Sequence, residues 1–318
     1  MSERFFVPGP IRADLVLLTG SEAHHLLHVM RARVGDRVVL FDGTGWEFEA
    51  EVVQIARQEA RLRICRQSYV DRELPVLLVV GVAMPKGDRQ RWLVEKAVEL
   101  GVGRLVPLIG QRSVVRPGPA LLARLRRSVI EASKQCGRNR LMEIGGPMSW
   151  SEWVSAYQGA GVRWVADPAG RPVWAEAMVC REAAGRGEGA GRLEDPARGA
   201  EPCCPGGESM SGRGVLSAVQ PGGLVSLAEG AGPPATRAET SEASGEGPAK
   251  PIWAVAVGPE GGWTPEELQQ AQAAGWQPVS LGPRILRTET AVLALAALLA
   301  AQATGSCAAG SARREQWV

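Results

Sequence analysis

The chain has 318 residues, of which 45% are hydrophobic and 22% charged, with a formal net charge of +2, so it can bury a full core and is long enough for two domains. Its six cysteines show no C-x-x-C spacing, which argues against a zinc ribbon or a dithiol redox pair. The first ten residues lack the apolar stretch of a signal peptide, and the apolar run AVLALAALLAAQA is too short to span a membrane, so we expect a cytoplasmic protein with no membrane partner.

A small β-rich domain is predicted at the front of the chain, over residues 1–72. Residues 36–66 are short alternating apolar runs interrupted by DGTG, a pattern typical of a hairpin. The segment HHLLH places His24 and His28 at i and i+4, the spacing of two metal ligands on one helix face. It lacks the glutamate of HExxH, and a metal would need further carboxylate or cysteine ligands. We therefore predict no metal site.

From residue 73 onward, apolar strands alternate with helical segments, and this alternation predicts a parallel sheet covered by helices. The predicted strands are residues 75–83, 104–109, 162–167, 252–257 and 278–281, and the predicted helices are 89–100, 120–136, 264–274 and 289–302.

Residues 181–249 interrupt this pattern. They are rich in Gly and Pro and contain neither an aromatic residue nor isoleucine, which is the composition of a disordered insertion. Acidic residues outnumber basic ones within it, so the rest of the chain carries the whole positive excess.

Two glycine-containing loops follow successive predicted strands. The first, VGPEGGWTPEEL at residues 257–268, leads into a helix start in which Thr264 is the expected N-cap and Glu267 completes a capping box. The second, LGPRILRTETAVLAL, spans residues 281–295. Neither contains a P-loop or a G-x-G-x-x-G fingerprint. On these residues alone, the first loop is either a tight turn or a ligand loop. Its place at the carboxyl end of a buried strand favours a ligand.

The predicted helix 120–136 and the turn after it are strongly basic, with a single acidic residue, Glu131, in this stretch. A solvated helix face explains such a run in many proteins. The density of positive charge also suits contacts with the phosphates of a nucleic acid, which we consider the better interpretation.

The two glycine loops, together with KGDRQRWLVEKAVELGV from Lys86 and EASKQCGR from Glu131, resemble the ribosomal RNA small-subunit methyltransferase E family. The resemblance covers nearly the whole chain except residues 181–249, an insertion longer than the family pattern needs, and the tail 308–318. It implies a PUA-like β-barrel over 1–72 and a SPOUT-type α/β domain over 73–307, whose parallel sheet ends in a trefoil knot. It also implies S-adenosylmethionine as cofactor, a homodimer, and methylation of N3 of a uridine in 16S ribosomal RNA within the small subunit. Two alternatives stay open: an inactive RNA-binding protein on the same scaffold, and a methyltransferase that acts on transfer RNA.

The resemblance also suggests roles for individual residues. Arg287 is the predicted catalytic residue. The predicted cofactor-binding residues are Gly258, Pro259, Glu260, Gly261, Gly262, Leu281, Gly282, Ile285, Leu286, Glu289, Thr290 and Ala291. The predicted RNA-binding residues are Arg31, Arg33, Lys86, Arg112, Lys134 and Arg138.

Overall fold

The computed structural model describes residues 3–175 and 250–307 of the chain. Two sheets lie in this part, one formed by the first 70 or so residues and one by the residues that follow. The segment 181–249 and the tail 308–318 lie outside the described residues, so what the sequence predicts about them stays a prediction.

The front of the chain forms a five-stranded sheet in the order β1-β3-β4-β5-β2. The DGTG segment joins β3 to β4 as an antiparallel hairpin, and β1 pairs parallel with β3. The sheet packs around Phe5, Leu26, Leu40 and Leu62, all of which are fully buried. The predicted small β-rich domain is therefore confirmed. Its elements are β1 (Arg4–Phe6), β2 (Leu15–Leu18), α1 (Gly20–His24), η1 (His25–Val29), β3 (Arg37–Phe41), β4 (Trp46–Ile55) and β5 (Ala60–Tyr69).

The second sheet is parallel throughout, in the order β12-β10-β11-β6-β7-β8, and β9 also pairs with β7. The predicted α/β class is confirmed, whereas the trefoil knot stays a prediction. The strands are β6 (Leu77–Val82), β7 (Arg104–Ile109), β8 (Glu143–Ile144), β9 (Met148–Ser149), β10 (Val162–Pro172), β11 (Ile252–Val257) and β12 (Gln277–Ser280). The helices are α2 (Arg89–Glu99), α3 (Pro119–Cys136), α4 (Trp150–Ala156), α6 (Pro265–Ala273) and α7 (Thr288–Cys307).

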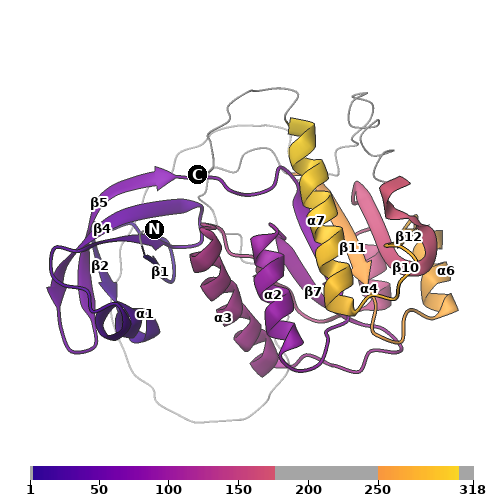
Figure 1. The fold of residues 1–318 in the computed structure, drawn as a ribbon, viewed down its shortest axis with the longest axis horizontal. Coiled ribbons are helices and arrows are strands. Elements are labelled where there is room, and N and C mark those ends of the chain that lie inside the picture. The colour runs from indigo at the N-terminus through magenta and orange to yellow at the C-terminus, as the bar shows by residue number, and fades with distance from the viewer. Residues whose placement is uncertain (1–2, 176–249, 308–318) are drawn as a thin grey trace, which may run out of the picture. The chain divides into compact units, whose positions relative to one another are not determined.

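Helices cover both faces of the parallel sheet, which explains why its strands are apolar at nearly every position. On β6, Leu78 and Val80 belong to the core cluster that includes α2, α3 and α7, which Figure 1 shows on the near side of the sheet. Val79, between them, belongs to the second cluster, with Trp153 of α4 and Ala271 of α6. Both faces of the strands are therefore buried.

Helix α7 is longer than the predicted helix 289–302. Its 18-residue window Thr288–Gly305 is long and apolar enough to cross a membrane by length and composition, whereas the run AVLALAALLAAQA within it is shorter. Half of that window is buried inside the described structure, where Val292, Leu295 and Leu299 pack in the core of the parallel sheet. A helix in the core of a soluble protein can have the same length and composition, and the packing of α7 supports that interpretation.

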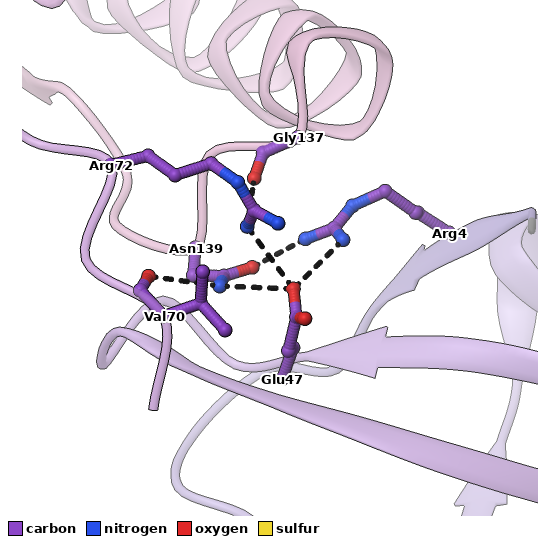
Figure 2. A network of polar contacts seen from close by, with 6 residues as sticks. All are labelled: Arg4, Glu47, Val70, Arg72, Gly137 and Asn139. Atoms are coloured by element: carbon purple, nitrogen blue, oxygen red, sulfur yellow. Dashed lines mark hydrogen bonds and ion pairs between the residues drawn. The ribbon is translucent and has the colours of Figure 1, made fainter. Parts of the chain in front are cut away.

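A polar network links the front sheet to the end of α3 (Figure 2). Glu47 on β4 accepts hydrogen bonds from Arg4 at 3.2 Å, Arg72 at 3.1 Å and Asn139 at 3.2 Å. Arg4 also donates to the Asn139 side-chain carbonyl, and Arg72 donates to the carbonyl of Gly137 at 2.9 Å. Because Asn139 is 1% exposed, the network ties one carboxylate of the β-domain to a buried turn of the α/β domain.

This network predicts an acid-sensitive contribution to stability. Burial alone would raise the pKa of Glu47, but the hydrogen bonds from Arg72, Asn139 and Arg4 hold it below its ordinary value of 4.5. A carboxylate whose pKa is lowered by folding stabilises the fold above its unfolded-state pKa, and this stabilisation is lost as the pH falls through the folded-state value. We expect Glu47→Gln to lose less stability than the wild type between about pH 6 and about pH 3, measured by urea unfolding.

The matched control for this prediction is Glu49→Gln, two residues along the same strand. The Glu49 side chain is 52% exposed, and its ion pair with Arg66 is long, at 3.9 Å. We expect this variant to follow the pH dependence of the wild type. Equal pH dependence in the wild type and both variants would contradict the role assigned to the network.

Candidate active site

An open pocket lies at the carboxyl ends of β10, β11 and β12, the edge at which ligands bind in parallel α/β sheets. It offers about 120 Å³ to water-sized groups, and about 650 Å³ when its wide mouth and the solvent there are included. Both predicted glycine loops line it, the first after β11 and the second between β12 and α7. The two loops therefore contribute to one site.

The first loop ends at a firmly capped helix. The Thr264 hydroxyl accepts a hydrogen bond from the Glu267 N–H at 3.3 Å, and the Glu267 carboxylate accepts one from the Thr264 N–H at 2.8 Å. The second carboxylate oxygen of Glu267 accepts from the Gln111 N–H, also at 2.8 Å. The predicted capping box is confirmed, and it holds the first loop against the segment that follows β7.

The glycines of the first loop serve its own packing. A Cβ atom on Gly258 would lie 2.9 Å from the ring of buried Trp263, so the indole needs a glycine there. A Cβ on Gly261 would meet the Arg112 side chain at 3.4 Å, and that guanidinium donates to the Gly261 carbonyl at 2.8 Å. Gly262 has φ +68°, a turn conformation that L residues rarely adopt. Gly258 and Gly262 line the pocket, while Gly261 faces Arg112.

The second loop is bound to the first through the start of α7. The Thr288 hydroxyl donates to the Gly258 carbonyl at 3.2 Å, and Thr288 itself lines the pocket. Gly282 has φ +113° and its N–H donates to the Ser280 hydroxyl at 3.3 Å. The predicted catalytic residue, Arg287, lies at the end of this loop, exposed, and its side chain makes no hydrogen bond or ion pair with the described residues.

Strand β10 contributes pocket residues that sequence reasoning missed. Its register with β12 shifts between Ala166 and Arg171, and Asp167 and Pro168 in this irregular stretch line the pocket. The Asp167 carboxylate accepts from the Ala169 N–H at 2.8 Å, which closes a local turn. Asp167 lies at the carboxyl end of a predicted strand, and this position could have indicated that it lines the pocket.

A small charged cluster lies where α2, the first loop and α7 meet. Arg89 donates to the Glu260 carboxylate at 2.8 Å and lies 3.6 Å from Glu289. The pKa of Arg89 is raised, chiefly by its hydrogen bond to Glu260. Glu289 is 5% exposed, and its Oε2 atom has no hydrogen-bond partner among the described residues. An unpaired buried carboxylate oxygen is unfavourable, so this atom has the capacity to accept one further hydrogen bond.

Most of the predicted cofactor-binding residues line this pocket. Gly261, Glu289 and Thr290 do not: Gly261 faces Arg112, Glu289 is buried beside Arg89, and Thr290 is exposed. The predicted residues that line the pocket are Gly258, Pro259, Glu260, Gly262, Leu281, Gly282, Ile285, Leu286 and Ala291.

Two predicted RNA-binding residues, Lys134 and Arg138, form ion pairs within the fold and are largely shielded from water, while their part in RNA binding stays a prediction. Lys134 has a side chain only 10% exposed and binds Glu22 at 3.0 Å. Arg138 has a side chain 6% exposed; it pairs with Glu73 and donates to two backbone carbonyls. Their charge is therefore used inside the fold.

The other four predicted RNA-binding residues are exposed. Arg31, Arg33 and Lys86 make no side-chain hydrogen bond or ion pair within the described part of the chain. Arg112, the fourth, donates to the carbonyls of Gly261 and Trp263 and so supports the first loop. Among the described residues, no group of three or more His, Cys, Asp or Glu side chains could hold a metal ion.

A parallel α/β sheet with a glycine-lined pocket at its carboxyl edge, preceded by a separate β-domain, is typical of α/β proteins that bind a small organic ligand. A family model for the RNA methyltransferase domain matches residues 72–186 and 223–300, and one for the RNA methyltransferase PUA domain matches residues 18–65. The chain therefore belongs to the RNA methyltransferase family, and the predicted family and PUA-like front domain are confirmed.

The chain is also similar to known methyltransferases in sequence and in structure. Ribosomal RNA small subunit methyltransferase E of Synechocystis sp. is 28% identical over 284 residues, covering 89% of this chain and 72% of the relative. The crystal structure of the enzyme of the same name from Neisseria gonorrhoeae, bound to S-adenosyl methionine, has a TM-score of 0.65 and 27% identity over 94% of this chain and 97% of its own. A methyltransferase of Legionella pneumophila in complex with S-adenosylmethionine has a TM-score of 0.66 and 25% identity over 97% and 98% of the two chains.

Proposed function

We propose that this protein methylates N3 of a uridine in the 16S ribosomal RNA of the small subunit, with S-adenosylmethionine as the methyl donor. One observation carries the proposal: the two loops on which the family resemblance rests are the loops that line the pocket. Relatives of the same family, similar over nearly the whole chain, bear the name of a small-subunit RNA methyltransferase or hold this cofactor.

The residues of the pocket suit this cofactor. S-adenosylmethionine, when bound, supplies an electrophilic methyl group. The apolar side chains of Leu281, Leu286 and Ala291 offer contact to its adenosine, and the absence of side chains at Gly258 and Gly262 lets a ligand approach the loop backbone closely. The carboxylate of Asp167 at the pocket wall is an acceptor for a hydroxyl or ammonium group.

The chain must also bind the uracil, whose N3 proton passes to solvent water when the methyl group takes its place. N3 is engaged in base pairing in a helix, so the uridine is unpaired or turned out of the helix when it reaches the pocket. Arg287, a free cation at the pocket edge, places positive charge beside the anion that forms when N3 is deprotonated. Most of the rate enhancement then comes from positioning and charge stabilisation.

We propose that Glu289 acts by positioning its neighbours. It lies at the start of α7, where the positive end of the helix dipole interacts favourably with a carboxylate, and Arg89 lies 3.6 Å away. Its Oε2 atom has no hydrogen-bond partner among the described residues and can accept one further hydrogen bond.

Two measurements test the proposal. In cells that lack this protein, mass spectrometry of 16S ribosomal RNA should show the loss of 3-methyluridine, which the wild-type gene restores. The purified protein should transfer a labelled methyl group to small subunits or 16S ribosomal RNA from those cells. Transfer to transfer RNA alone supports the second candidate, and binding of RNA without any transfer supports an inactive RNA-binding protein.

We also propose that the protein is cytoplasmic and that it forms a homodimer. The reason for the homodimer is that α7 has an apolar side that the described structure leaves open. Half of the window Thr288–Gly305 is not buried, although it is apolar nearly throughout. Close by, Ile285 in the second loop is 90% exposed. A second copy that covers these residues removes apolar surface from water.

Light scattering at micromolar concentration should therefore give twice the mass of the chain, and Ile285→Glu should shift the equilibrium toward the monomer. An exposed aliphatic residue far from this region, Leu17, which is 49% exposed on β2, provides the control Leu17→Glu. A wild-type protein that stays monomeric contradicts the proposed dimer.

A further inference from the structure

Two aromatic side chains lie exposed at the end of the front sheet. Trp46 opens β4 and Tyr69 closes β5, and the two residues are direct cross-strand partners. Their rings pack edge to face, with centroids 5.5 Å apart and an interplanar angle of 71°. Trp46 is 40% exposed and Tyr69 is 48% exposed. Each ring therefore keeps a large part of its surface in water while the partner restricts its motion.

The pair is held by a segment of the α/β domain. Arg140, just after α3, donates to the Tyr69 hydroxyl at 3.2 Å, and Arg140 forms an antiparallel bridge with Thr44. The Gly45 N–H donates to the Asn139 carbonyl at 3.3 Å. Gly45 itself has φ +106°, and a Cβ there would lie 2.8 Å from the Tyr69 ring. Both domains of the described chain thus contribute to one aromatic surface.

The surroundings of this surface carry a positive excess. The carboxylates there are mostly paired with arginine: Glu47 accepts from two guanidinium groups, and Glu73 is bound by Arg138. Asp71 lies 4.0 Å from Lys250. Arg140 is exposed, and its NH2 group donates to Tyr69. In the described structure, no carboxylate lies within ion-pair distance of its guanidinium. Cationic groups beside exposed rings are the features that bind single-stranded RNA.

We propose that Trp46, Tyr69 and Arg140 form a stacking site for an unpaired nucleobase of the RNA substrate. Stacking on the exposed ring faces supplies the contact with the base, and Arg140 supplies charge for a neighbouring phosphate. The site lies outside the pocket that takes the methyl donor, and it rests on the proposed function in that RNA is the substrate. The site binds the flat face of an unpaired base, so binding does not depend on which base it is.

A protein partner is a poorer occupant of this surface. Two partly exposed aromatic side chains expose roughly 200 Å² together, whereas a stable protein interface buries about 800 Å² on each partner. A nucleobase presents a flat ring of a size that one or two aromatic side chains can cover. The size of the surface and its charge therefore both favour RNA.

The test measures binding of a fluorescent, unpaired ten-nucleotide RNA and of a duplex of the same length to the full chain. Trp46→Ala and Tyr69→Ala should weaken binding of the unpaired RNA by about 5- to 30-fold, as loss of one stacked base does. Trp46→Phe should stay within about 2-fold of the wild type because it keeps a ring. The control is Leu17→Ala, an exposed apolar residue of the same sheet.

Affinity for the duplex should be unchanged in all these variants, and calorimetric affinity for S-adenosylmethionine should be that of the wild type. Alanine variants that bind unpaired RNA as tightly as Leu17→Ala overturn the stacking site, and so does an equal loss on the duplex. If an alanine variant does not fold, quenching of tryptophan fluorescence by the unpaired RNA decides: the quenching should be smaller in Trp46→Phe than in the wild type, and equal quenching overturns the site. None of these measurements requires methyl transfer. They can therefore disprove the stacking site without disproving the proposed methylation, and the methylation can be disproved without affecting the stacking site.

Discussion

Replacing Arg287 with alanine should lower methyl transfer to small-subunit RNA by about 100-fold or more, while the affinity for S-adenosylmethionine stays within a few-fold of the wild type. The reason is position: Arg287 lies at the end of the loop that forms one wall of the pocket, but it does not line the pocket itself. It is exposed and unpaired in the described structure, so a substrate anion does not have to displace an existing partner. Single-turnover methyl transfer and calorimetry separate the two effects.

Arg57→Ala is the matched control for this experiment. Arg57 is also exposed and free of hydrogen bonds and ion pairs within the described residues, but it lies in the turn between β4 and β5. We expect its turnover to equal that of the wild type. Turnover of Arg287→Ala near the wild-type rate would remove Arg287 from the mechanism and direct attention to Lys86, which is exposed after β6.

Replacing Arg138 with methionine should destabilise the fold by about 3–5 kcal/mol, the cost of breaking a buried ion pair from one side. Arg138 pairs with Glu73 and donates to the carbonyls of Val98 at 3.0 Å and Val102 at 2.9 Å. Without the guanidinium, the Glu73 carboxylate, whose side chain is 11% exposed, keeps its charge in a place shielded from water. Urea unfolding of the wild type and the variant measures the difference.

The double variant Arg138→Met with Glu73→Gln should recover part of this loss, because it also removes the uncompensated charge. Arg57→Ala should leave the free energy of unfolding within about 0.5 kcal/mol of the wild type, as exposed substitutions do. If Arg138→Met weakens RNA binding while its stability is unchanged, Arg138 is a surface cation after all and the structural role is wrong.

The sequence predicted the strands and long helices of the α/β domain well, because buried parallel strands are apolar runs and their helices carry caps that can be read locally. Thr264 and Glu267 form the capping box expected from their spacing. The same signature, Ser149 with Glu152, opens α4, a helix that the sequence analysis did not predict. This helix is only seven residues long, too short for an apolar period to be recognised.

The pocket could be located from sequence, but the roles of single side chains could not. Whether Arg138 or Lys134 is a surface cation depends on Glu73 and Glu22, which lie far away along the chain. No local pattern shows that pairing. The wall formed by Asp167 depends in the same way on a shift of register between two strands. The glycine at position 258 indicated that another group approaches the backbone closely. The sequence favoured a ligand there, whereas in the structure the Trp263 ring makes this approach.

The order of the strands sets a waiting time during synthesis. β6 ends at Val82, yet its neighbour β11 begins only at Ile252, and β10 pairs with β6 only through β11. At about 5–20 residues per second, one edge of β6 stays unpaired for roughly 10–30 seconds while the intervening chain leaves the ribosome. An apolar strand with an open edge is a template for wrong pairing. This edge of β6 is therefore exposed to wrong pairing until β11 has been made, and the length of segment 181–249 prolongs that interval.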